Sequence, residues 1–169
     1  KDINQQGLEL GLKQASANFK SMLKRKKITP DEFQRKQRSI HTTTDYKAFK
    51  QVDMVVEAIV EDMDVKKSVL AELEKEVKQD CIITTNTSSL SVGQMGSDLQ
   101  RPESFAGLHF FNPVNKMPLV EIISHDKVAP ETLQALHAWC LKANKMPVIV
   151  KDGPGFLVNR ILMSFLNES

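Results

Sequence analysis

A histidine and a glutamate lie in two neighbouring apolar runs, and the pair could perform acid–base chemistry. His109 lies in GLHFFNP at residues 107–113, and Glu121 lies in PLVEII at residues 118–123. A buried carboxylate is costly unless it is paired. If the chain turns back between the two runs, the residues face each other across an antiparallel pair, with Cβ atoms ~4.5–5.5 Å apart. A carboxylate–imidazole hydrogen bond fixes the imidazole tautomer and suits a general base.

The alternative is a structural histidine and a glutamate that is neutralised elsewhere. Two features favour the catalytic interpretation: Asn112 lies close by, and His109 lies at the carboxyl end of a predicted strand, where open α/β sheets bind ligands. The other three histidines are His41, His125 and His137, and none of them has a second histidine in an H-x-x-x-H pattern or a neighbouring cysteine. We therefore predict no metal site.

Two other segments place polar side chains after predicted strands. TNTSS at residues 85–89 includes Ser88, whose hydroxyl could bind a carboxamide, a ribose or a carbonyl group of a ligand. A helix cap and turn explains the same residues equally well. EAIVED at residues 57–62 includes Glu61, which could accept from a ribose, and Lys66 follows one turn into the next helix. A solvated helix start is the alternative for this second pair.

Short β-branched runs alternate with amphipathic stretches, which is typical of βαβ units and a mainly parallel sheet. The runs Val55-Val56 and Ile82-Ile83 are expected to be buried on both faces of central strands. The predicted strands cover residues 40–43, 54–58, 81–85, 105–111, 119–124 and 148–151. The predicted helices cover residues 5–26, 63–77, 130–143 and 156–166, with a further helix that begins at Thr29-Pro30.

Asp2 lies where a strand would be ending, directly before the first helix. In a dinucleotide-binding fold, an acid at the end of the second strand holds ribose hydroxyls, ~20 residues after the motif G-x-G-x-x-G. The chain does not contain that motif. We therefore expect a fragment of such a domain without its first strand and phosphate loop. The alternative is a terminal aspartate that is merely solvated.

Composition excludes several classes of protein. The 169 residues are 41% hydrophobic and 26% charged, as is ordinary for a globular domain. With 23 basic and 21 acidic side chains, the charge balance gives no signal for nucleic-acid or membrane partners. No apolar run approaches the ~18–20 residues of a membrane span, and no signal peptide is apparent. Cys81 and Cys140 lie among apolar residues, which predicts buried thiols and a cytoplasmic location.

Six segments carry a resemblance to a known family, in order and with matching spacings. They are KDIN at 1–4, VVEAIVE at 55–61, NTSSL at 86–90, GLHFFNPV at 107–114, MPLVEII at 117–123 and DGPGFLVNR at 152–160. Through them the chain resembles the L-3-hydroxyacyl-CoA dehydrogenases, most closely the dehydrogenase part of the bacterial multifunctional fatty-acid-oxidation α-subunit. This resemblance implies a truncated Rossmann-like NAD-binding domain over residues 1–152. Residues 153–169 would form the hinge and first helix of a C-terminal helical domain.

The resemblance also implies an activity and its residues. An L-3-hydroxyacyl-CoA would be oxidised to the 3-oxoacyl-CoA in fatty-acid β-oxidation, with hydride passing to NAD. His109 would be the base and Glu121 its orienting carboxylate. The implied cofactor contacts are Asp2, Ile59, Val60, Glu61, Lys66, Ser88 and Asn112. The implied substrate contacts are Ser88, Asn159 and, toward the coenzyme A phosphates, Arg25. An aspartate at position 2 favours NAD over NADP.

The expected partners are an acyl-CoA substrate, a thiolase β subunit in the full complex and a second copy in a homodimer. The isolated chain is expected to bind NAD weakly and to be inactive or weakly active. Two rival functions stay open: an NAD-dependent dehydrogenase of a free 3-hydroxy acid, and a non-catalytic Rossmann-like assembly module. The first commonly uses a catalytic lysine, and the second would not need the His–Glu pair.

Overall fold

The computed structural model describes residues 1–167, and it describes side chains as far as residue 162. The chain divides into two compact units, one from Lys1 to Lys50 and one from Gln51 onward. Among the described residues, no helix is long and apolar enough to cross a membrane.

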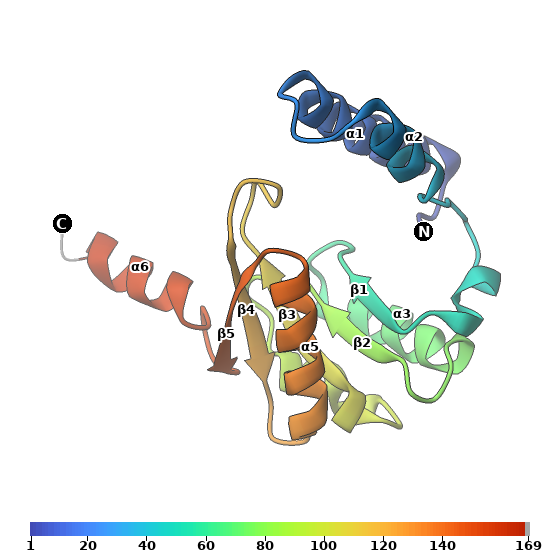
Figure 1. Cartoon of the computed structure of the whole chain (residues 1–169). Helices are drawn as coiled ribbons and strands as arrows, with labels where there is room; N and C mark the ends of the chain where they lie inside the picture. Colours follow the sequence, from blue (N-terminus) through green and yellow to red (C-terminus); the bar gives the residue numbers. More distant parts are fainter. Residues whose placement is uncertain (168–169) are drawn as a thin grey trace. The chain divides into compact units, whose positions relative to one another are not determined.

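The first unit is a hairpin of two helices, α1 (Gln5–Lys24) and α2 (Pro30–Arg38) (Figure 1). The predicted start of the second helix is confirmed: Thr29 Oγ1 accepts from the backbone N–H of Glu32, whose carboxylate accepts from the N–H of Thr29. Such a reciprocal pair satisfies two N–H groups that a helix start otherwise leaves free. Lys26 has a φ of 56°, so α1 ends before it.

The strand predicted at residues 40–43 is wrong, because the structure assigns no strand there. A strand is stable only when its backbone groups pair with those of a neighbouring strand, and β-branched residues alone do not supply such a neighbour. In this segment Thr43 accepts one backbone bond, from Asp2 N at 3.2 Å. The Thr43 hydroxyl also accepts from the N–H of Asp45, which bends the chain into a turn.

The second unit is built on a sheet of five strands in the order β1-β2-β3-β4-β5 (Figure 1). The strands are β1 (Met54–Glu57), β2 (Ile82–Thr85), β3 (Phe105–Phe110), β4 (Leu119–Ser124) and β5 (Met146–Lys151). Three of the four pairings are parallel, and β3 with β4 is antiparallel. The predicted mainly parallel α/β sheet is therefore confirmed, and its last strand begins at Met146, two residues earlier than expected.

Helices connect most of the strands, and a last helix follows β5. They are α3 (Met63–Glu76), α4 (Val92–Met95), α5 (Pro130–Lys142) and α6 (Val158–Asn167), with 3₁₀ turns at Lys47–Gln51, Gly96–Asp98 and Pro102–Ser104. Helix α5 lies across one face of the sheet (Figure 1). It packs Leu136 and Cys140 onto the sheet residues Ala106, Leu108, Val120 and Ile122. The buried thiols predicted from the sequence are thus confirmed for both cysteines.

The opposite face of β3 and β4 carries His109 and Glu121, because alternate residues of a strand point to opposite faces. The register pairs His109 directly with Glu121, as predicted. On this same face Gly107 lies so close to Ile123 and Val92 that a Cβ atom would stand 2.7 Å from the Ile123 side chain. The absence of a side chain at Gly107 therefore lets α4 approach the sheet.

The prediction that Val55 and Val56 are both buried is wrong for Val56, whose exposed fraction is 37%. Among the described residues, β1 forms one edge of the sheet, so one of its faces is less covered than in a central strand. The neighbouring strand fits the prediction better, since Ile83 is buried and Ile82 packs against the α5 core. In β1 the second buried residue beside Val55 is the charged residue Glu57.

Candidate active site

A buried imidazole–carboxylate pair lies at the centre of the site. His109 Nδ1 lies 2.8 Å from Glu121 Oε2, and the residues are 6% and 1% exposed. Because a carboxylate oxygen accepts, Nδ1 carries the donated proton and Nε2 of the neutral ring is left as the acceptor. Strand alternation brings the two residues to the same face, and the turn at residues 112–118 sets their register.

Three hydrogen-bond donors hold the carboxylate of Glu121. Besides His109 on Oε2, Glu121 Oε1 accepts from the backbone N–H groups of Leu157 at 3.0 Å and Val158 at 2.9 Å. These amides belong to the start of α6. Hydrogen bonds of this kind explain how a buried carboxylate is tolerated in the sheet.

Two aromatic rings flank the imidazole. Phe111 lies 4.5 Å and Phe156 lies 5.8 Å from the His109 ring, measured between ring centroids. Both rings are tilted relative to the imidazole. The aromatic packing limits rotation of His109 and excludes water from two sides of the ring.

His109 opens onto a cavity of about 460 Å³ at the carboxyl ends of β1, β2 and β3. The cavity is lined by Ala58, Ile59, Glu61, Lys66, Asn86, Ser88, His109, Phe110, Phe111, Asn112 and Asn159. Ligands of open α/β sheets bind at this end of the strands. The lining combines apolar walls with a few convergent polar groups, as is usual for small-molecule sites.

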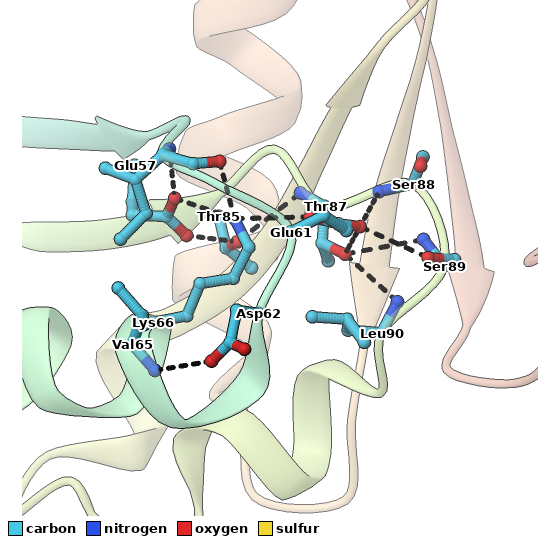
Figure 2. Close-up of polar contacts among 11 residues, drawn as sticks. Glu57, Glu61, Asp62, Val65, Lys66, Thr85, Thr87, Ser88, Ser89 and Leu90 are labelled. Carbon is cyan, nitrogen blue, oxygen red and sulfur yellow. Dashed lines mark hydrogen bonds and ion pairs between the residues drawn. The ribbon is translucent and has the colours of Figure 1, made fainter.

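A buried ion pair involves Lys66, which is one of the cavity-lining residues, and Figure 2 shows its contacts. Lys66 Nζ lies 2.8 Å from Glu57 Oε1 and 3.4 Å from Glu61 Oε2. Glu57 also accepts from the N–H of Ile59 at 2.6 Å and from the Thr85 hydroxyl at 2.7 Å. The positive charge of Lys66 is therefore balanced by carboxylates of the protein. The bond from Ile59 also ties the end of β1 to the loop that follows it.

Glu61 is bound to the loop after β2 (Figure 2). Its Oε1 accepts from the Thr87 hydroxyl, from the Ser89 hydroxyl at 3.2 Å and from the N–H of Ser88 at 3.1 Å. Partial burial opposes ionisation, but the bonds from Thr87 and Ser88 and the Lys66 ammonium outweigh it and hold the pKa of Glu61 below its ordinary value. Glu61 is therefore ionised at neutral pH, and one of its faces borders the cavity.

The pattern described as "3-hydroxyacyl-CoA dehydrogenase, NAD binding domain" matches residues 1–153. The chain belongs to this family. NAD is the cofactor of the family, and the predicted family membership is confirmed.

Solved structures agree with this family. The 3-hydroxybutyryl-CoA dehydrogenase of Escherichia coli K12 is 35% identical, with a TM-score of 0.95 over 99% of this chain and 35% of that one. The (S)-3-hydroxybutyryl-CoA dehydrogenase of Ralstonia eutropha is 34% identical, with a TM-score of 0.95 over 99% of this chain and 59% of that one. The dehydrogenase part of multifunctional enzyme 1 from C. elegans is 34% identical, with a TM-score of 0.74 over 87% of this chain and 34% of that one. The chain therefore spans about a third to three fifths of these relatives.

Most of the residues predicted from the sequence meet in the second unit of this dehydrogenase domain. Seven line the same cavity: Ile59, Glu61, Lys66, Ser88, His109, Asn112 and Asn159. Asn159 Nδ2 also donates to the backbone oxygen of Ser88 at 3.3 Å, which joins α6 to the loop after β2. Glu121 lies behind His109, and Val60 is 65% exposed outside the cavity lining. Asp2 and Arg25 lie in the first unit.

Sequence reasoning missed Glu57 and Phe156 as parts of the site. Glu57 carried the same signal as Glu121, namely an acid within an apolar strand, which predicts a buried partner. Phe156 was assigned to a helix that in fact begins at Val158. Its φ of 47° is incompatible with a helical residue, and its side chain is buried against His109.

The residues of the cavity fit the nicotinamide end of NAD. An ionised carboxylate at Glu61 offers an acceptor for ribose hydroxyls, and Asn112 and Ser88 offer groups for a carboxamide. The printed sequence contains no G-x-G-x-x-G loop for the diphosphate. Within the described residues, no group of three or more metal-ligating side chains is present.

Proposed function

We propose that this chain forms the NAD-binding part of an enzyme that oxidises an L-3-hydroxyacyl-CoA to the 3-oxoacyl-CoA. The observation that carries the proposal is the 2.8 Å hydrogen bond between His109 Nδ1 and Glu121 Oε2, with the imidazole bordering the cavity. A base at a strand end, oriented by a buried carboxylate, is what the removal of an alcohol proton requires.

His109 takes the proton of the substrate hydroxyl on Nε2 as the carbon–oxygen double bond forms. NAD, when bound, supplies the acceptor for the hydride that leaves the same carbon. Glu121 holds the imidazole in the tautomer whose Nε2 is free, and it stabilises the imidazolium that results. Phe111 and Phe156 keep water from the ring, which strengthens this electrostatic interaction.

The remaining site residues receive roles by position. Ser88 and Asn112 contact the reacting carbon and the nicotinamide, and Asn159 contacts the substrate. Ile59, Val60, Glu61 and Lys66 lie near the cofactor. Asp2 binds the adenosine ribose, and Arg25 meets the coenzyme A phosphates. The pairing of Lys66 with two glutamates supports a positioning role for that lysine.

The wider setting is also proposed from the family. Residues 1–152 form the cofactor domain, and residues 153–169 begin the helical domain that completes the substrate cleft. The reaction belongs to fatty-acid β-oxidation in the cytoplasm, within a multifunctional enzyme that pairs with a thiolase β subunit or a second copy. The 169-residue chain alone binds NAD weakly and turns over little, because it has no diphosphate loop.

Two rivals are distinguished by the site. Dehydrogenases of free 3-hydroxy acids commonly use a lysine, but the lysine that lines the described cavity is paired with Glu57 and Glu61. An assembly module would have no use for a buried His–Glu pair beside a cavity.

The experiment is an assay of the intact protein with NADH and acetoacetyl-CoA, beside free acetoacetate as the matched substrate. Oxidation of NADH with the thioester alone is the expected result. Turnover of the free acid at equal or higher kcat/KM would replace the proposal with the free-acid dehydrogenase. Turnover of neither substrate would favour the assembly module.

A further inference from the structure

We infer that the left-handed turn at Gly155–Phe156 is a positioning element of the His109–Glu121 pair, and that it couples the start of α6 to the base. This inference rests on the proposed function for its catalytic consequence. The contacts behind it come from three separate segments: β3, β4 and the hinge before α6.

The first contact is the capping of a helix by a distant carboxylate. The first N–H groups of a helix have no partner within the helix. At the start of α6, the N–H groups of Leu157, directly before the helix, and of Val158, its first residue, donate to Glu121 Oε1 at 3.0 and 2.9 Å. The positive end of the helix also favours a negative charge there. The carboxylate is thus held from both oxygens, by α6 on Oε1 and by His109 on Oε2.

The second contact is the ring of Phe156. This residue is 5% exposed and its centroid lies 5.8 Å from that of His109. Its φ of 47° is uncommon for a bulky residue and persists only where the surroundings hold it. One turn therefore supplies both the amides that orient Glu121 and a ring that packs on the imidazole.

Gly155 makes this turn possible. Its φ is +71°, a conformation that residues with a side chain rarely adopt, and an added Cβ would stand 3.0 Å from Arg160 N. Arg160 N in turn donates to the Gly155 carbonyl at 3.0 Å, which closes the first turn before the helix proper. A side chain at this position would therefore displace the start of α6, and with it the amides of Leu157 and Val158.

The consequence is a mechanical link between the hinge and the base. A shift of α6 changes the orientation of Glu121 and the packing of Phe156 together. It also pulls on the loop after β2, because Asn159 donates to the Ser88 carbonyl at 3.3 Å. The turn contacts Glu121 and His109 directly, whereas it reaches Glu61 only through Asn159 and the loop after β2, so the main effect falls on the base.

The test compares Gly155→Ala with the matched control Gly153→Ala. Gly153 lies two residues away in the same hinge, has no positive φ, and a Cβ there would meet nothing within 4 Å. In the intact protein, Gly155→Ala is expected to lower kcat by up to about 100-fold, as for a misplaced catalytic group, with little change in the KM for NAD. Gly153→Ala is expected to keep the wild-type kcat. Gly155→Asn should recover part of the loss, because Asn tolerates the left-handed region.

A second readout does not depend on turnover. The proton on His109 Nδ1 should give a downfield NMR resonance in the wild type and in Gly153→Ala. The resonance is assigned by the change in its chemical shift in Glu121→Gln. It should shift or broaden in Gly155→Ala. In the wild type, the amides of Leu157 and Val158 should also exchange slowly with deuterium, and they should exchange faster in Glu121→Ala.

The outcomes separate this inference from the proposed function. Equal kcat values for Gly155→Ala and Gly153→Ala, with an unchanged Nδ1 proton resonance, would overturn the inference while leaving the dehydrogenase intact. Fast exchange of both amides in the wild type would overturn it even if Gly155→Ala failed to fold. An inactive wild type that keeps the NMR signatures would refute the proposed function alone.

Discussion

Lys66 Nζ lies 2.8 Å from Glu57 Oε1, and the two side chains are only 1% and 2% exposed. A lysine that borders the cavity and a glutamate behind its lining thus pair with almost no access to water. Glu57 is on β1 and Lys66 is in the first turns of α3, so the pair ties the strand to the helix that follows it. Removal of Lys66 leaves the Glu57 carboxylate in the interior without its cation.

Lys66→Met should therefore destabilise the fold by about 3–5 kcal/mol, the range for breaking a buried ion pair from one side. The matched control is Lys67→Met, at the next position of α3. Lys67 pairs with Asp98 at 3.1 Å, but these side chains are 29% and 65% exposed, so its loss should have a much smaller effect. Urea denaturation of both variants measures the difference. Similar losses at the two positions would refute this ranking.

The hydrogen bonds to Glu61 predict a pH dependence. Because its pKa is lowered in the folded protein, ionised Glu61 stabilises the fold above the ordinary value of 4.5. This stabilisation is lost as the pH falls through the folded-state pKa. The free energy of unfolding of wild type should exceed that of Glu61→Gln near neutral pH, and the two should converge in acid. Glu72→Gln, at an exposed position of α3, is the control and should change the free energy of unfolding little near neutral pH.

Part of this site was predictable from sequence, because strand alternation has a period of two residues. If the predicted strands at residues 105–111 and 119–124 pair in an antiparallel way across a turn at 113–118, the pairing of His109 with Glu121 follows, and the structure has this register. The helix start at Thr29 was predictable for a similar reason, since a capping box is a local signal. The prediction of a strand at residues 40–43 was wrong, because a β-branched segment forms a strand only where a neighbouring strand pairs with it.

The contacts of Glu121 with α6 were not predictable. Backbone amides carry no sequence signature, and Leu157 and Val158 lie more than 30 residues along the chain from Glu121. The choice of Glu57 over Glu61 as the closer partner of Lys66 likewise depends on three-dimensional packing. Sequence located the acids and the lysine, whereas their pairing required the fold.

Burial of the two cysteines predicts low reactivity. Burial raises the pKa of the Cys81 and Cys140 thiols above their ordinary value of 9.0, and the thiolate is the reactive form. A disulfide reagent such as Ellman's reagent should label neither residue in the folded chain at pH 8 and both in denaturant. The raised pKa also means that these groups cost stability once the pH rises above 9.0, where the unfolded thiols ionise. Rapid labelling of the native chain would contradict the burial.

Glu121→Gln separates the effect of the Glu121 charge on His109 from the hydrogen bonds that its side chain accepts from α6. Glu121→Gln keeps an oxygen for the amides of Leu157 and Val158 but places an uncharged group beside His109 Nδ1. We expect a fold close to wild type by circular dichroism and a kcat that is lower by at least about tenfold, because the imidazolium loses its stabilising charge. Measurement of kcat and of KM for NAD separates the effects. A raised KM with an unchanged kcat would place Glu121 outside the proton transfer.

The most direct test of the central claim is the turnover of His109→Gln in the intact protein, with acetoacetyl-CoA and NADH. In this direction the protonated His109 returns the proton to the forming hydroxyl, and general acid–base catalysis predicts a fall in kcat of about 10²–10⁴-fold, with a KM for NADH close to wild type. His137→Gln, on α5, is the matched control and should retain wild-type turnover. A His109→Gln enzyme that turns over as fast as the His137→Gln control would contradict the claim that this imidazole carries the proton.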